Sequence, residues 1–147
     1  MGDINLQVTG ADDLAAALDQ VKRRVHQATR RAVTTAMGQV HEQTQVLLSL
    51  TSHPPGTPTP SPPGAPPSRV TGHLLGSLSP TGPIDSGGSV TGRLGPTAVY
   101  ARIQELGGVT GAGHRTRLPP RPYLRPAYRL VRGRISRTFA DAWRSAL

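Results

Sequence analysis

The sequence predicts an α+β fold with a long N-terminal helix, a small antiparallel sheet, a C-terminal helix and a proline-rich linker. Three observations support this prediction. Apolar residues recur every three or four positions over residues 14–47 and again over residues 126–146. Between these regions, short segments alternate apolar with polar residues and are broken by glycine and proline. Because periods near 3.6 and 2 are typical of helices and of half-buried strands, the order of these segments indicates a mixed fold.

A strand is the first element expected, at residues 4–9, where apolar and polar residues alternate. Gly10 ends this strand. Asp12 and Asp13 follow at the positions where a helix favours an N-cap residue and a negative charge for its dipole.

One helix of nearly forty residues is predicted after these aspartates. Its apolar positions keep a 3-4 spacing and then resume shifted by one residue: Leu14, Leu18, Val21, Val25, Ala28 and Ala32, then Val33, Met37, Val40, Thr44 and Leu47. At 1.5 Å per residue such a helix is about 55 Å long. So small a domain cannot cover a helix of that length, and we expect part of the apolar stripe to contact another subunit.

Residues 51–68 contain eight prolines and no Asp, Glu, Lys or Arg. This composition leans towards polyproline conformation and has no means of forming a packed core, so it predicts an extended connector. A ligand for an aromatic groove is the alternative. The tract divides the chain into residues 1–50, with the strand and long helix, the linker at 51–68, and an α+β core at 69–147.

Short elements are expected after the linker. Thr71 can cap a short helix that contains Leu74, Leu75 and Leu78. A turn-rich piece is expected at residues 79–88.

Residues 89–108 alternate loosely and predict strands. The apolar positions of this segment are Val90, Leu94, Val99 and Tyr100. Gly92 and the pair at residues 95–96 break these strands, and a glycine-rich basic loop is expected at residues 107–117.

The stretch LPPRPYLRPAYRL at residues 118–130 combines prolines, arginines and two of the three tyrosines of the chain. Pro119, Pro120 and Pro122 exclude a helix, so this part is expected to be an extended arm. Pro126 suits a first helical turn, and a helix is predicted from there to Ala146. The apolar stripe expected for that helix is Leu130, Ile135, Phe139, Ala142 and Trp143.

The charge of the chain is +9, and it is concentrated at the C-terminal end. Residues 114–147 contain nine arginines and one aspartate. A basic segment of this kind favours a polyanion as partner, and the alternative is a solvated or subunit-facing surface.

No enzyme active site, cofactor site or metal site is indicated. The chain has no cysteine, and no apolar run approaches the roughly 20 residues that span a bilayer. His41 begins a stretch that resembles a zinc-protease helix, but Gln45 stands where the second histidine is required. Glu105 is an isolated carboxylate in a basic segment, and we expect it to pair with an arginine rather than to act as a catalytic base.

Three motifs occur in order between residues 68 and 130, and together they resemble a family of tail-completion, or head-to-tail joining, proteins of long-tailed bacteriophages, similar to the minor tail protein Z group. The family pattern is a long N-terminal helix followed by TG-x-L-x-x-S, YA-x-x-x-E-x-G and P-x-R-P-[FY]-[LM]-R-P-A. The matching residues are Thr71, Gly72, Leu74 and Ser77; then Tyr100, Ala101, Glu105 and Gly107; then Pro120, Arg121, Pro122, Tyr123, Leu124, Arg125, Pro126 and Ala127. The proline tract and the glycine loop depart from the pattern.

The resemblance implies a structural virion protein that forms a hexameric ring at the neck, where the tail meets the head connector. Its implied neighbours are the tail terminator, the head stopper or connector, and tail-tube or tape-measure proteins, with genome DNA passing through the lumen. It also implies assembly in the host cytoplasm, with no membrane, cofactor or enzymatic activity. A tail terminator ring and a basic nucleic-acid-binding protein are the alternatives.

Tyr123 and Arg125 are the residues of the arm with the clearest expected role. Held by flanking prolines, they would insert into a neighbouring subunit with little loss of entropy. The alternative for Tyr123 is a place in the core of its own chain.

Overall fold

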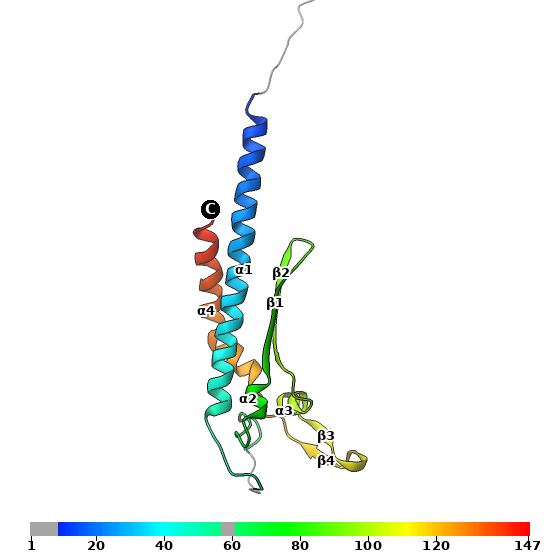
Figure 1. Ribbon diagram of the computed structural model, residues 1–147. Helices are drawn as coiled ribbons and strands as arrows, with labels where there is room; N and C mark the ends of the chain where they lie inside the picture. Colours follow the sequence, from blue (N-terminus) through cyan, green and yellow to red (C-terminus); the bar gives the residue numbers. More distant parts are fainter. Residues whose placement is uncertain (1–8, 57–60) are drawn as a thin grey trace, which may run out of the picture.

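The computed structural model of this chain describes residues 9–56 and 61–147 and has an α+β architecture, as predicted. Figure 1 shows the long helix α1 (Ala11–Ser49) running the length of the molecule, with α4 (Leu124–Arg144) beside its lower part and the ribbon of β1 and β2 on another side. The short elements gather at the end where α1 stops and α4 begins. In the described part of the chain, no helix is both long enough and apolar enough to cross a membrane. The strand predicted at residues 4–9 falls outside the described residues except for Thr9.

Helix α1 confirms the predicted long helix, but its N-terminus differs from the prediction. Gly10 occupies the N-cap position with φ 89°, and no side chain caps the helix. Asp12 and Asp13 lie in the first turn, where their charge still suits the helix dipole. Near the C-terminal end the buried leucine is Leu48 rather than Leu47.

Helix α4 packs antiparallel against α1. Gln39 Nε2 donates to Thr138 Oγ1 at 2.9 Å, and Trp143 Nε1 donates to Thr29 Oγ1 at 2.9 Å. The buried residues of α4 are Ala127 and Val131. Because their side chains are small, the two helices can approach each other closely. The predicted stripe was wrong at Leu130, which is 66% exposed.

Strands β1 (Leu78–Ser86) and β2 (Ser89–Pro96) form a two-stranded antiparallel ribbon against α1. The prediction of a turn-rich piece at residues 79–88 was therefore wrong. A two-stranded ribbon leaves one edge of each strand unpaired, and prolines such as Pro80 and Pro83 are tolerated there. The register shifts between Thr81 and Ile84, where the segment containing Gly82 departs from regular pairing.

Gly92 does not interrupt β2, contrary to prediction, because it lies where the strand passes closest to α1. A Cβ added at Gly92 would approach Met37 Sδ to 2.5 Å and Val33 Cγ1 to 2.7 Å. The absence of a side chain therefore permits this approach.

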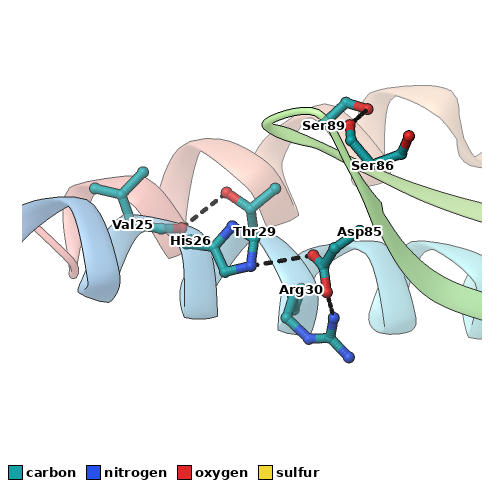
Figure 2. Close-up of polar contacts among 7 residues, drawn as sticks. All are labelled: Val25, His26, Thr29, Arg30, Asp85, Ser86 and Ser89. Atoms are coloured by element: carbon teal, nitrogen blue, oxygen red, sulfur yellow. Dashed lines mark hydrogen bonds and ion pairs between the residues drawn. The ribbon is translucent and has the colours of Figure 1, made fainter.

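Asp85 joins the far end of the ribbon to α1, as Figure 2 shows. Its carboxylate contacts the guanidinium of Arg30 and lies 3.0 Å from His26 Nε2. All three side chains are partly exposed, so the contact orients the ribbon more than it stabilises the fold.

Helix α3 (Ala101–Leu106) replaces the last of the strands predicted in residues 89–108. The predicted basic loop at 107–117 was also wrong: β3 (Gly108–Thr110) and β4 (Thr116–Leu118) pair antiparallel, with the single-turn helix η1 (Ala112–His114) between them. Each strand has three residues, too few for a clear alternating pattern.

Helix α2 (His73–Gly76) confirms the short helix after the linker, although Leu78 lies beyond it in β1. The predicted cap was wrong, because Gly72 rather than Thr71 occupies the N-cap position and no side chain caps the helix there. Thr71 Oγ1, one residue earlier, accepts a hydrogen bond from the His73 amide at 3.3 Å.

The two ends of the proline tract lie together, with Thr51 Oγ1 and Ser68 Oγ 2.8 Å apart. The amide of Arg69 donates to the carbonyl of Thr51 at 2.8 Å, and the amide of His53 donates to the carbonyl of Arg69 at 3.1 Å. Ser61 is buried, and its Oγ accepts from the Ser68 amide at 2.6 Å. The two ends of the tract are thus held together, and α2 begins close to the point where α1 ends.

Candidate functional site

The three motifs meet at one place in the fold, which we call the motif joint: residues 71–77, 100–107 and 119–127. These segments contribute α2, α3 and the start of α4. The joint therefore brings together residues that lie about fifty positions apart in the sequence.

Glu105 connects the second motif to the third through three backbone amides. Its Oε2 accepts from the amides of Tyr123 and Leu124, at 2.7 and 3.0 Å, and its Oε1 accepts from the amide of Arg125 at 3.0 Å. The first amides of a helix have no partner within that helix, and a carboxylate there also complements the helix dipole. The expected structural role of Glu105 is present, but its partners are amides rather than an arginine side chain.

Pro126 completes this arrangement at the start of α4. It is the third residue of the helix and has no N–H to satisfy, while Ala127 donates the first bond to the Tyr123 carbonyl, at 3.2 Å. Every donor in the first turn is therefore either bound by Glu105 or missing. This is why the helix begins at Leu124, two residues before the predicted start.

Tyr123 lies in the core of its own chain, with 0% of its surface exposed. It packs with Leu48 and Leu78, and its hydroxyl donates to the Ala101 carbonyl at 3.3 Å. Burial, together with the negative charge of Glu105, raises the pKa of the Tyr123 phenol. Of the two roles considered for this residue, the intramolecular one is observed.

Gly107 allows the chain to turn from α3 towards the extended arm. Its φ is 70° and its ψ −179°, a combination that essentially only glycine adopts. A Cβ there would lie 2.8 Å from the Pro120 nitrogen and 2.9 Å from the Leu118 carbonyl oxygen. The glycine of the second motif thus permits close contact with the proline of the third.

Arg121 ties the arm to the proline tract. The residue is 7% exposed, and its Nε donates to the Ser61 carbonyl at 2.8 Å. Its backbone amide donates to the Gln104 carbonyl at 2.7 Å. Ser61 and Gln104 were not singled out from the sequence, because a backbone carbonyl can belong to any residue.

The first motif stabilises the turn from α2 into β1. Gly72 has φ 78°, Ser77 Oγ donates to the Leu74 carbonyl at 2.8 Å, and the Ser77 carbonyl accepts from the Thr97 amide at 2.9 Å. Leu74 packs against the cluster that contains Tyr123.

Not every motif residue directs its side chain into the joint. Arg125 is exposed, and only its amide contacts the joint. Tyr100 is partly exposed, with its ring 6.0 Å from that of His73, while Ala101, Ala127, Pro122 and Leu124 pack within the joint. Arg125 therefore remains available to a partner.

The arginines of α4 lie mostly on its surface. Arg125, Arg129, Arg132, Arg134 and Arg137 are exposed, and among the described residues none of their side chains forms an ion pair. Arg144 pairs with Asp141 at 2.9 Å.

Residues 9–56 and 61–147 contain no group of three histidine or carboxylate side chains suited to hold a metal ion. Within the joint, the Glu105 carboxylate, the Arg121 guanidinium and the Tyr123 hydroxyl take part in hydrogen bonds that hold the fold. Comparisons with protein-family models, characterised proteins and solved structures found no match for the chain.

Replacing Glu105 with glutamine is expected to destabilise the fold by about 1–3 kcal/mol, because hydrogen bonds to a charged acceptor are the stronger ones and three amides share this carboxylate. Urea unfolding followed by circular dichroism measures the change. Glu42→Gln is the matched control, since Glu42 is exposed on α1 and should tolerate the same substitution. Equal stability of the two variants would contradict the capping role.

Proposed function

We propose that this chain is a structural virion protein of a long-tailed bacteriophage, which forms a ring at the head-tail junction, completes the tail and joins it to the head connector. The observation that carries the proposal is the convergence of the three motifs at the joint. Glu105 of the second motif binds amides of the third, and Leu74 of the first packs near Tyr123 of the third. The resemblance therefore rests on residues that act together rather than on isolated matches.

The shape of the molecule supports an assembly role. Residues 11–20 of α1 are all exposed, although Leu14 and Leu18 are among them. A subunit that leaves apolar helix surface uncovered gains stability from its neighbours. The polar side chains Glu105, Arg121 and Tyr123 of the joint are bonded to backbone groups, which supports a structural rather than a catalytic role.

The proposal includes specific neighbours and a location. The ring is hexameric, contacts the tail terminator and the head stopper or connector, lies near tail-tube or tape-measure proteins, and surrounds the path of genome DNA. It belongs to the neck of the virion, after assembly in the host cytoplasm.

Deleting the gene from the phage that encodes this chain tests the proposal. We expect filled heads and tails of normal length to accumulate unattached, and labelled protein supplied in trans to mark the head-tail junction by electron microscopy. Tails of altered length would favour a tail terminator instead, because a terminator caps the growing tube. Normal infectious particles without the protein would refute a virion role.

Arg125→Ala provides a milder version of this test. Its side chain lies on the surface, so the variant should fold as the parent does, yet joining should be reduced if Arg125 contacts a neighbour. Complementation of the deletion by this variant, scored as joined particles, measures the effect. Full complementation would remove Arg125 from the proposed contact.

The exposed arginines of α4 favour nucleic-acid binding as a second candidate function. Binding through several phosphate contacts falls steeply with salt. A purified monomer that binds DNA in this manner and is absent from particles would support this candidate over the ring.

A further inference from the structure

An apolar groove of about 300 Å³ lies between β2 and α4. Helix α1 packs against both of these elements and forms the floor of the groove. The residues that define it include Val33, Met37 and Val40 of α1, Leu94 of β2, and Ile135 and Phe139 of α4. Among the described residues that line the groove, none is charged. The groove therefore suits an apolar occupant.

The wall formed by β2 has an unpaired edge. Strand β2 pairs with β1 along one edge, and no other strand of the described chain pairs with it. Gly92 and Leu94 of β2 line the groove, whereas no described residue of β1 does. The free edge of β2 therefore borders the groove.

The backbone of Leu94 points towards this free edge. In an antiparallel pair, hydrogen-bonded and non-hydrogen-bonded positions alternate along the strand. The Thr97 amide donates to the Ser77 carbonyl, so Leu94, three residues earlier and opposite Pro80, is at a non-hydrogen-bonded position. Pro80 agrees with this assignment because it has no N–H. The amide and carbonyl of Leu94 are thus open to a further strand, whereas Pro80 removes the corresponding donor from the free edge of β1.

A strand that adds to β2 would bond this edge through its backbone and lay every second side chain on the floor of the groove. Residues 4–9, INLQVT, are predicted from the sequence to be a strand and lie outside the described residues except for Thr9. Their alternation places Ile4, Leu6 and Val8 on one side. The segment contains no proline, so every residue keeps its amide donor.

The segment cannot reach the groove of its own chain. Val33, which lies in the groove, is 22 positions after Ala11, or about 33 Å along α1 at 1.5 Å per residue. Ile4 is seven positions before Ala11, and seven extended residues span at most about 25 Å. Helix α1 also carries the segment away from the body, because Figure 1 shows α1 continuing beyond the end of α4, where Trp143 contacts Thr29.

We propose that residues 4–9 of one copy of this chain add as a third strand to the free edge of β2 in a second copy, with Ile4, Leu6 and Val8 on the floor of the groove. The segment and the groove are different surfaces, so the contact is head-to-tail and repeats from copy to copy. The inference rests on the proposed ring, which such contacts form when the rotation between copies closes.

Serine substitutions on the two sides of the segment test the contact in the full chain. Ile4→Ser with Leu6→Ser removes apolar side chains from the proposed contact and is expected to weaken self-association at least roughly tenfold. Light scattering over a concentration series measures the change. Asn5→Ser with Gln7→Ser is the matched control, since it alters the opposite side of the same segment and should associate as the parent does. Equal association of the two double variants would overturn the proposal.

A synthetic peptide with the sequence of residues 1–10 tests the strand addition directly. Added to the full-length variant with Ile4→Ser and Leu6→Ser, the peptide is expected to bind once per chain and to slow hydrogen exchange at the Leu94 amide. Peptides N-methylated at Leu6 or at Gln7 lose amides on opposite edges of the strand, so one should fail to bind and the other should still bind. Binding that neither methyl group affects, or that leaves Leu94 unprotected, would overturn the proposal.

Disulfide cross-linking in the full chain gives a third test, because the chain has no cysteine of its own. Ala36 lines the groove, so oxidation of the variant with Leu6→Cys and Ala36→Cys is expected to give a ladder of linked copies. Leu6 cannot reach Ala36 of its own chain, and each such link therefore joins two copies. Leu6→Cys with Leu130→Cys is the control, since Leu130 is exposed on α4 and does not line the groove. Equal linking in both variants would overturn the proposal.

The outcomes separate this contact from the proposed function. An oligomer that is found at the neck and is unaffected by the serine substitutions would refute the contact and retain the joining role. An oligomer that depends on Ile4 and Leu6 but is absent from virions would retain the contact and refute the role. A wild-type chain that stays monomeric at all concentrations, with the groove filled by a different protein, would overturn the contact.

Discussion

Replacing Tyr123 with alanine is expected to destabilise the fold by about 3–5 kcal/mol, the range found when a buried aromatic side chain is removed from a core. Tyr123 is fully buried between Leu48 and Leu78, and its backbone lies in the capped turn of α4. Since whole domains are stable by only about 5–15 kcal/mol, this single change would remove a large part of the total. Urea unfolding at neutral pH measures the effect, and a loss under about 1 kcal/mol would contradict the core role.

Tyr123→Phe is the matched control, because it keeps the ring and removes only the hydrogen bond to the Ala101 carbonyl. Its expected cost at neutral pH is about 0.5–1.5 kcal/mol.

At alkaline pH the order of stability of the parent and the phenylalanine variant should change. Since burial raises the pKa of the Tyr123 phenol in the folded state, its contribution is fully present below the unfolded pKa of about 10 and is lost as the pH rises above that value. The phenylalanine variant should therefore lose less stability above pH 10 than the parent.

Gly107→Ala is expected to cost about 3 kcal/mol or more. The backbone conformation at Gly107 is one that other residues rarely adopt, and this alone costs roughly 1–3 kcal/mol. The new methyl group would also overlap the backbone at Pro120 and Leu118, which cannot move without disturbing the arm. Thermal unfolding measures the loss, together with the yield of folded protein.

Gly88→Ala provides the comparison for Gly107. Gly88 also has a positive φ, of 85°, but a Cβ there would meet nothing within 4 Å. The expected cost is therefore only the conformational part, about 1–2 kcal/mol. If the two alanine variants were equally stable, the overlap at Gly107 would add nothing to the free-energy cost. The backbone at Pro120 and Leu118 would then be able to move away from the new methyl group.

The two long helices were predictable because each repeats its apolar spacing over several turns. Even there the sequence misassigned Leu130, because an exposed leucine and a buried one are identical in a periodicity pattern. The N-terminal boundary of α4 was also displaced, because Pro126 suits any position of a first turn and Glu105, which defines the start, lies nineteen residues before Leu124.

The small elements were harder to predict for a different physical reason. Strand β1 contains two prolines and a glycine, which usually mark turns, and is held by pairing with β2 rather than by its own propensity. Helix α3 has only six residues, so a helical period and a strand period are equally consistent with its apolar positions. In both cases tertiary contacts decide the local structure.

The motif joint was predicted as a set of residues but not as a set of contacts. The sequence indicated that Glu105, Tyr123 and Arg121 matter, and all three belong to the joint. What no pattern could reveal is that backbone groups supply most of their partners. A backbone amide or carbonyl has the same chemistry at every position, so only the fold identifies which one is used.

The antiparallel pairing of α1 with α4 has a consequence for synthesis on the ribosome. The contacts between Gln39 and Thr138 and between Thr29 and Trp143 join residues 99 and 114 positions apart. At translation rates of roughly 5–20 residues per second, α1 emerges about 5–20 seconds before the helix that covers it. During that interval the whole apolar face of α1, and not only its N-terminal half, is open to chaperones and to other nascent chains. The length of chain between the two helices therefore sets how long this face stays uncovered.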